Sequence, residues 1–263
     1  MKIVVCAKQV PDTTEVKLDP KTNTLIRDGV PSIINPDDKS GIEAALKIKE
    51  QVGGTVTVVC MGPPQADVAI REALAMGCDD GVLISGREFG GSDTLATSTI
   101  IAAGLKTLDY DLIITGRQAI DGDTAQVGPQ IAEKLHLPQV TYAADIQKDG
   151  DTITVKRMLE DGYMTIKVKT PCLITCIKEL NTPRYMSVGG VFEAYSKPLT
   201  TLGYEDLKDD PLIDATTIGL KGSPTNIFKS FTPPQKGVGM MLEGDGKETC
   251  EKLASILAEK HII

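Results

Sequence analysis

The loop at residues 116–129 reads GRQAIDGDTAQVGP and decides how the rest of the chain is interpreted. A mostly apolar run at residues 111–115 precedes it, and a run with helical periodicity at residues 127–135 follows it. A strand, a glycine-bearing turn and a helix start together present free backbone N–H groups to an anion. Gly122 lets a ligand approach the backbone closely, and Asp123 and Thr124 are residue types that favour helix N-caps. The loop therefore predicts a phosphate or pyrophosphate site.

A second copy of this loop occurs earlier in the chain. Residues 86–96 read GREFGGSDTLA and align with residues 116–126, with Gly, Arg, Asp and Thr at matching positions. One interpretation is that each Asp-Thr pair merely caps a helix. We favour a shared nucleotide site, because two glycine-rich loops at one sheet edge meet where doubly wound folds bind nucleotides.

The composition argues against several classes of partner and location. The net charge of −8 argues against nucleic acid and anionic membranes, so phosphate groups would rest on backbone N–H groups and a few basic side chains. No apolar run is long enough to span a membrane, and no secretory signal precedes the first predicted strand. The six cysteines suit reduced thiols, and the spacing of Cys172 and Cys176 does not favour a metal or redox pair. We therefore expect a cytoplasmic protein.

Strands and helices alternate through the first half of the chain, which predicts an α/β fold with a doubly wound parallel sheet of the Rossmann-like nucleotide-binding type. The binding edge of such a sheet carries the loops that leave the carboxyl ends of its strands. The first helix is expected to be capped by Asn35 or by the Asp37–Asp38 pair, with Pro36 in its first turn. Strands are predicted at residues 3–6, 55–60, 82–85 and 111–115, and later helices at residues 65–76, 93–108 and 127–135.

The second half of the chain has a different character. Alternating residues at 152–158 and 165–169 predict a hairpin, and the apolar run at residues 171–177 predicts a strand that extends the sheet or covers its edge. A further short hairpin is predicted at residues 16–27. We expect residues 1–195 to form the nucleotide-binding domain. Residues 196–263 are expected to form a Pro/Gly-rich arm, with a terminal helix from residue 247, that packs on a partner subunit.

Across essentially its full length the sequence resembles the β-subunit of electron-transfer flavoproteins. The matching segments are KIVVCAKQVPD at residues 2–12, NPDD at 35–38, ALAMG at 73–77, GRQAIDGD at 116–123 and LNTPRY at 180–185. The resemblance implies a heterodimer with an α-subunit that holds a flavin. It also implies that residues 183–190 form the loop that recognises partner dehydrogenases. Met164 departs from the family, which usually has Glu or Gln there, at a position that we interpret as structural.

Two branches of the family differ in the nucleotide that the β-subunit binds. Housekeeping members hold AMP, in a loop that reads like DDDxNQTGQ. This chain has DGDTAQVGP at residues 121–129 and SDTLATS at 92–98, and so resembles the electron-bifurcating branch, in which a second FAD replaces AMP and meets NADH. The implied reaction is hydride transfer from NADH to that flavin. One electron would then pass to ferredoxin or flavodoxin, and the other through the α-subunit FAD to an acyl-CoA or hydroxyacid dehydrogenase. The flavin does this chemistry, so no catalytic side chain is predicted.

The resemblance also implies which residues surround the cofactor. An AMP-holding β-subunit and a nucleotide-sensing regulatory module without a redox role are the alternatives, because related folds host both. Asp93, Thr94 and Thr97 are expected from the loop repeat to contact pyrophosphate or NADH. The cofactor-binding residues implied by the family are Cys6, Ala7, Lys8, Asn35, Pro36, Asp37, Asp38, Met61, Gly62, Gly116, Arg117, Gln118, Asp121, Gly122, Asp123, Thr124, Ala125, Gln126 and Val127.

Overall fold

The computed structural model describes residues 1–12, 31–225, 237 and 239–263. The hairpin predicted at residues 16–27 lies outside this range. The chain divides into two compact units, Met1–Ile227 and Phe228–Ile263. None of the helices among the described residues is long and apolar enough to cross a lipid bilayer.

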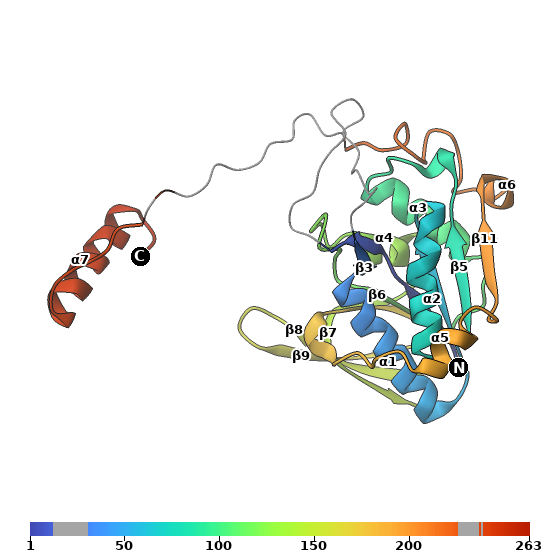
Figure 1. Cartoon of the computed structure of the whole chain (residues 1–263), viewed down its shortest axis with the longest axis horizontal. Helices are drawn as coiled ribbons and strands as arrows, with labels where there is room; N and C mark the ends of the chain where they lie inside the picture. Colours follow the sequence, from blue (N-terminus) through green and yellow to red (C-terminus); the bar gives the residue numbers. More distant parts are fainter. Residues whose placement is uncertain (13–30, 226–236, 238) are drawn as a thin grey trace. The chain divides into compact units, whose positions relative to one another are not determined.

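The first unit is built on a nine-stranded sheet in the order β11-β5-β4-β1-β6-β10-β7-β8-β9 (Figure 1). Neighbouring strands run parallel, except that β8 is antiparallel to both β7 and β9. This arrangement confirms the predicted α/β fold with a hairpin extension. The strands are β1 (Lys2–Cys6), β4 (Thr55–Met61), β5 (Asp80–Ile84), β6 (Leu112–Gly116), β7 (Gln139–Asp149), β8 (Thr152–Met158), β9 (Tyr163–Lys169), β10 (Cys172–Cys176) and β11 (Leu199–Leu202).

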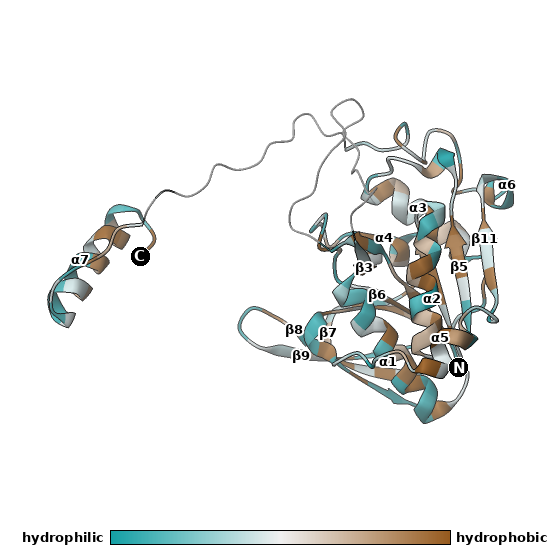
Figure 2. Ribbon diagram, in the orientation of Figure 1, coloured by the Kyte–Doolittle hydropathy of each residue, from teal (hydrophilic) through white to brown (hydrophobic). Residues whose placement is uncertain are grey.

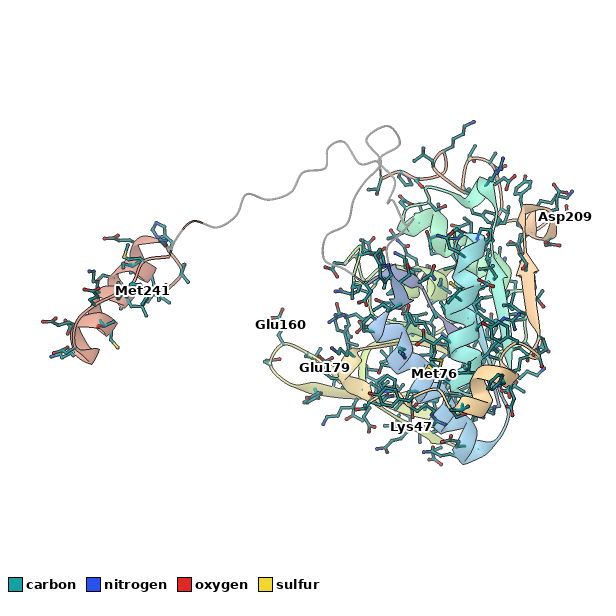
Figure 3. The ribbon with its side chains drawn as sticks, in the orientation of Figure 1. Lys47, Met76, Glu160, Glu179, Asp209 and Met241 are labelled. Atoms are coloured by element: carbon teal, nitrogen blue, oxygen red, sulfur yellow. The ribbon has the colours of Figure 1, made fainter. Side chains whose placement is uncertain are left out.

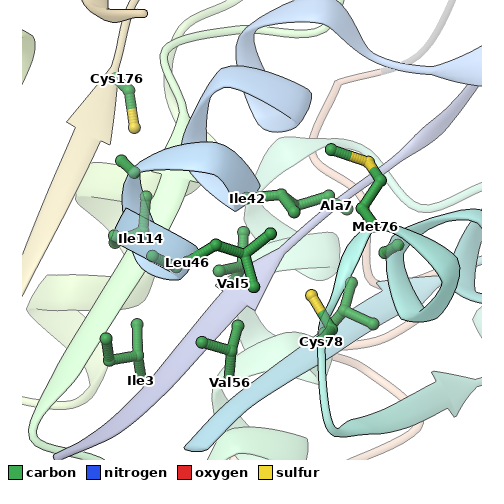
Figure 4. Packing of buried hydrophobic residues seen from close by; sticks show 14 of the residues in the cluster. Ile3, Val5, Ala7, Ile42, Leu46, Val56, Met76, Cys78, Ile114 and Cys176 are labelled. Atoms are coloured by element: carbon green, nitrogen blue, oxygen red, sulfur yellow. The ribbon is translucent and has the colours of Figure 1, made fainter. Parts of the chain in front are cut away.

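Helices cover both faces of this sheet. Alternate residues of a strand point to opposite faces, so Ile3 and Val5 of β1 pack with α1 and α2, whereas Val4 packs with α3 and α4. Figure 4 shows Ile42 and Leu46 of α1 packed around Val5. The core is mostly aliphatic. The helices on the two faces are α1 (Pro36–Val52) and α2 (Asp67–Met76) on one side, and α3 (Thr94–Leu105) and α4 (Val127–Lys134) on the other.

Local sequence explains where these helices begin and end. Pro36 occupies the first turn of α1, where its missing N–H group costs nothing. Gly53 ends α1 with φ 74° and Gly77 ends α2 with φ 130°, a backbone region that residues with a Cβ rarely adopt. The predicted helix at residues 65–76 begins as a 3-10 turn, η1 (Pro64–Ala66), and continues as α2.

The sheet continues beyond the strands that the apolar runs predicted. The run at residues 171–177 contains β10, which lies between β6 and β7, so it extends the sheet rather than covering its edge. The hairpin of β8 and β9 is confirmed, with Glu160 at its tip (Figure 3). Its hydrophilic tip contrasts with the more hydrophobic central strands (Figure 2). The sequence did not predict β7, nor the small sheet of β2 (Gln9–Pro11) and β3 (Ser32–Ile34).

The last third of the chain contains short elements and one longer helix. β11 pairs with β5 and so belongs to the main sheet, although it lies within the predicted arm. In the second unit, α7 (Gly246–Glu259) begins at Asp245, whose side chain accepts hydrogen bonds from the N–H groups of Lys247 and Glu248. The packing of residues 196–263 on a partner subunit stays a prediction. The remaining short elements are η2 (Arg87–Phe89), η3 (Lys178–Leu180), α5 (Val188–Glu193) and α6 (Tyr204–Leu207).

Candidate functional site

The two repeated loops meet at the carboxyl edge of the sheet. β5 leads into the loop before α3, and β6 leads into the loop before α4. The Thr94 hydroxyl donates a hydrogen bond to Oε1 of Gln126 at 2.9 Å, which joins the two loops directly. Two helix N-termini therefore lie close together, and both carry partial positive charge from their unpaired N–H groups.

The two Asp-Thr pairs have different structural roles. Asp93 caps α3, because its Oδ1 accepts the N–H group of Ala96 at 3.0 Å. Its Oδ2 accepts the N–H group of Thr225 at 3.0 Å, so both carboxylate oxygens have partners within the fold. The expectation that Asp123 and Thr124 cap a helix was wrong, because α4 begins at Val127 with Gln126 at its N-cap.

The loop before α4 instead has an irregular backbone, and the N–H groups of residues 124–126 have no hydrogen-bond partner among the described residues. Asp123 has φ 49° and Ala125 has φ 54°, in the left-handed region that is uncommon for residues other than glycine. Among the described residues, no acceptor pairs with the N–H groups of Thr124, Ala125 or Gln126. Unusual backbone conformations with free donors are a feature of ligand-binding loops. A Cβ built on Gly122 would meet nothing within 4 Å, so there is open space beside this loop.

A charged pair connects the end of β1 to the same loop. Lys8 Nζ lies 2.6 Å from Oδ1 and 2.8 Å from Oδ2 of Asp121. The lysine is partly exposed, whereas only 10% of the Asp121 side chain is exposed. The bidentate contact fixes the ammonium group at the edge where the two loops meet.

Asp38 connects the ends of the two neighbouring strands β1 and β6. Its Oδ2 accepts the N–H group of Lys8 at 2.8 Å, and its Oδ1 accepts the N–H group of Gly116 at 2.9 Å. Burial raises the pKa of Asp38 to about 7, although these two N–H groups favour the charged form. A Cβ on Gly116 would lie 2.1 Å from Oδ1 of Asp38, so only glycine allows this approach.

Asn35 holds the first part of the loop after β6. Its Nδ2 donates to the carbonyl oxygen of Gln118 at 2.8 Å, and its Oδ1 accepts the N–H group of Ile120 at 3.1 Å. Asn35 stands at the predicted N-cap position of α1, but its side chain makes no cap hydrogen bond. The side chain is committed to the Gln118–Ile120 backbone instead.

The Arg117 side chain contacts Asp37 of α1 and Tyr142 of β7. Its Nε lies 3.4 Å from Oδ2 of Asp37, and its guanidinium carbon lies 5.8 Å from the centre of the Tyr142 ring. Burial raises the pKa of Asp37, and the positive charge of Arg117 opposes this shift. Tyr142 has φ 58°, a strained backbone conformation for a bulky residue. The sequence analysis did not predict that Tyr142 contacts Arg117, and no local motif around Tyr142 indicates this contact.

The other predicted site residues lie at the same edge with mixed exposure. Cys6 is buried at the end of β1, and burial raises the pKa of its thiol, so it packs as an apolar residue. Met61, Gly62 and Thr97 are partly exposed at the end of β4 and in the first turns of α3. No cluster of three potential metal-ligating side chains occurs in the described ranges. The edge therefore combines backbone N–H donors that have no partner among the described residues with charged side chains held in the pairs Lys8–Asp121 and Arg117–Asp37. Backbone donors of this kind suit a nucleotide phosphate.

Comparisons with known proteins agree on one family. A family profile described as "Electron transfer flavoprotein domain" matches residues 22–206. The chain is 63% identical over 268 residues to the acryloyl-CoA reductase electron transfer subunit gamma of Anaerotignum propionicum, with 100% of both chains covered. It is 56% identical over 266 residues to the caffeyl-CoA reductase-Etf complex subunit CarD of Acetobacterium woodii, and 55% identical over 263 residues to the electron transfer flavoprotein subunit beta of Clostridium acetobutylicum. Both matches again cover 100% of each chain.

Proposed function

The chain belongs to the electron transfer flavoprotein family as a β-subunit, and from that premise we propose that it binds FAD at the carboxyl edge of its sheet and there accepts hydride from NADH. The observation that carries this proposal is the pair of helix N-termini joined by Thr94 and Gln126. A dinucleotide with its pyrophosphate needs such a concentration of backbone donors, because the net charge of −8 supplies no large basic surface.

The proposed phosphate contacts come from the backbone of the loop before α4. The free N–H groups of Thr124, Ala125 and Gln126 would donate to the pyrophosphate, and the dipoles of α3 and α4 would favour its negative charge. Thr94 is near enough to add its hydroxyl group, since that group bonds the side chain of Gln126. Asp93 would contribute only by capping α3, because both its oxygens have partners.

Small residues in this loop support FAD over AMP. Gly122 has open space where a side chain would stand, and Ala125 is the smallest residue with a Cβ. The bulkier polar residues of AMP-type loops would fill this space. Lys8 and Arg117 would provide the nearest positive charges, each already held by a carboxylate.

The role of the protein in this reaction is to bind and orient. When bound, the flavin supplies hydride acceptance from NADH and single-electron transfer, to a low-potential carrier such as ferredoxin or flavodoxin and to the FAD of an α-subunit. The names of the relatives from Anaerotignum propionicum and Acetobacterium woodii refer to CoA reductases. We therefore infer that the final acceptor of this chain is an acyl-CoA reductase or dehydrogenase. Membership of the family disfavours the alternative of a nucleotide-sensing regulator.

An anaerobic titration with NADH tests this function in the complex with the α-subunit. NADH is expected to bleach the flavin absorbance of the wild-type complex. The Gly122→Asp variant should lose β-subunit flavin by crowding and by repulsion of phosphate. Gly162→Asp is the matched control, because Gly162 lies in the turn between β8 and β9 and also has nothing within 4 Å of a built Cβ. A wild-type complex that NADH does not bleach would refute the proposed function.

A further inference from the structure

Building on the nucleotide site proposed above, on which this inference rests, we propose that Asn35 and Asp38 are positioning residues that set nucleotide affinity by holding the segment after β1 and the loop after β6 at a fixed spacing. This role differs from the direct ligand contact that the family resemblance implied for both residues. We call the two side chains, with their backbone partners, the Asn35–Asp38 bracket.

The bracket lies between β1 and β6, where the order in which successive strands are added to the sheet reverses. From β1 the chain proceeds through β4 to β5 on one side, and then returns to β6 on the other side of β1. Neighbouring strands whose connections leave in opposite directions open a crevice at their carboxyl ends, where doubly wound folds bind ligands. The ladder between β1 and β6 ends at Cys6 and Thr115, and Gly116 continues in register with Cys176 of β10.

The Asp38 carboxylate replaces the next rung of that ladder. One oxygen accepts the N–H group of Lys8 and the other accepts that of Gly116, at 2.8 and 2.9 Å. The two chains therefore separate by the width of a carboxylate instead of pairing directly. This spacing is rigid, because Asp38 is only 7% exposed and its helix, α1, packs on the sheet below.

Asn35 fixes the other end of the bracket. Its backbone N–H donates to the carbonyl oxygen of Lys8 at 2.9 Å, and its side chain bonds both Gln118 and Ile120. The loop after β6 is thus anchored through Asn35 to the segment after β1. Gln118 and Ile120 come just before residues 124–126, whose backbone N–H groups are unpaired among the described residues. The position of the anchored residues therefore determines where those N–H groups lie.

The carboxylate of Asp38 cannot be replaced by an amide without loss. Two N–H donors face it, and an amide offers only one acceptor oxygen, so one donor would face an NH₂ group. Protonation of Asp38 has a similar effect, because an O–H group replaces one acceptor. The titratable groups around it are Asp37 on the same helix, the thiols of Cys6 and Cys176, which burial keeps uncharged, and the pairs of Lys8 with Asp121 and Arg117 with Asp37.

The test measures the rate at which FAD leaves the purified complex with the α-subunit, followed by the fluorescence of released flavin after dilution. The Asp38→Asn variant is expected to release the β-subunit FAD faster by on the order of tenfold to a hundredfold, the equivalent of one charge-assisted hydrogen bond. Glu43→Gln is the matched control, because Glu43 is also a buried carboxylate of α1 but pairs with Arg184 instead.

The pH dependence separates positioning from a general loss of stability. Release from the wild-type complex should become faster as the pH falls through about 7, where Asp38 gains a proton, and Asp38→Asn should not show this change. Asn35→Ala, which removes the two loop bonds but no charge, should also release FAD faster and keeps the test valid if Asp38→Asn does not fold.

The possible outcomes distinguish this inference from the proposed function. Wild-type release rates in both bracket variants, with the wild-type pH dependence kept in Asp38→Asn, would overturn the inference and leave the proposed FAD site in place. A wild-type complex that carries AMP would refute FAD as the cofactor, and the same comparison made on AMP release would still decide whether the bracket sets affinity. A complex without any bound nucleotide would overturn both.

Discussion

Replacing Gly116 by alanine should destabilise the protein strongly, because this glycine touches the buried Asp38. The added Cβ would lie 2.1 Å from Oδ1 of Asp38 and 2.9 Å from Cβ of Asp37, closer than real Cβ contacts. Asp38 cannot move aside without breaking its bonds to Lys8 and Gly116. Overpacking costs about 1–3 kcal/mol, and loss of a hydrogen bond to a charged group costs about 1.5–3 kcal/mol. We therefore expect a loss of about 3–5 kcal/mol, a large part of a typical stability.

Urea unfolding of the complex with its α-subunit measures this loss. Both subunit and nucleotide concentrations must be equal between samples, because binding shifts apparent stability. Gly162→Ala is the control, since it adds the same methyl group where nothing lies within 4 Å and far from the nucleotide loops in sequence, in the turn between β8 and β9, and it should change stability by less than about 0.5 kcal/mol. A Gly116→Ala variant within about 1 kcal/mol of the wild type would refute the reasoning that this site is closed around Asp38.

Two further predictions concern pH and assembly. The pKa of Asp38 is raised from 3.8 to about 7 in the folded state, so its contribution to stability is fully present below pH 4 and is lost as the pH rises through 7. The free energy of unfolding of Asp38→Asn should therefore rise by about 4 kcal/mol relative to that of the wild type over that range. A difference between the two proteins in urea unfolding that stays constant from pH 5 to pH 8 would contradict this. The β-subunit should co-purify with its α-subunit through an obligate-type interface of more than ~2,000 Å². Light scattering that shows a stable monomer, with residues 196–263 protected from protease, would count against this.

The sequence predicted the central strands well, because continuous apolar runs mark buried parallel strands regardless of what surrounds them. It missed β7, where alternation is interrupted by a bulge near Tyr142 and by Ala143 and Ala144. It also assigned the same capping role to both Asp-Thr pairs. Only Asp93 caps a helix, because the chain after Asp123 takes left-handed turns that local sequence does not reveal.

The candidate site was predictable in position but not in its contacts. The order of strands and helices predicted that the two repeated loops lie at one edge of the sheet, and the structure places them there. The bonds of Asp38 and Asn35 join segments that are 78 and 85 residues apart, and no local pattern encodes such pairs. Composition likewise gave no sign that Arg117 would turn towards Tyr142.

The identity of the nucleotide in the purified heterodimer tests the central claim most directly. Heating the complex releases its bound nucleotides, which chromatography can separate and count against the amount of protein. We predict two FAD and no AMP for each heterodimer, because Gly122 and Ala125 are small and the N-termini of α3 and α4 lie close together. One FAD and one AMP for each heterodimer would contradict the account and leave this chain with the simpler electron-transfer role.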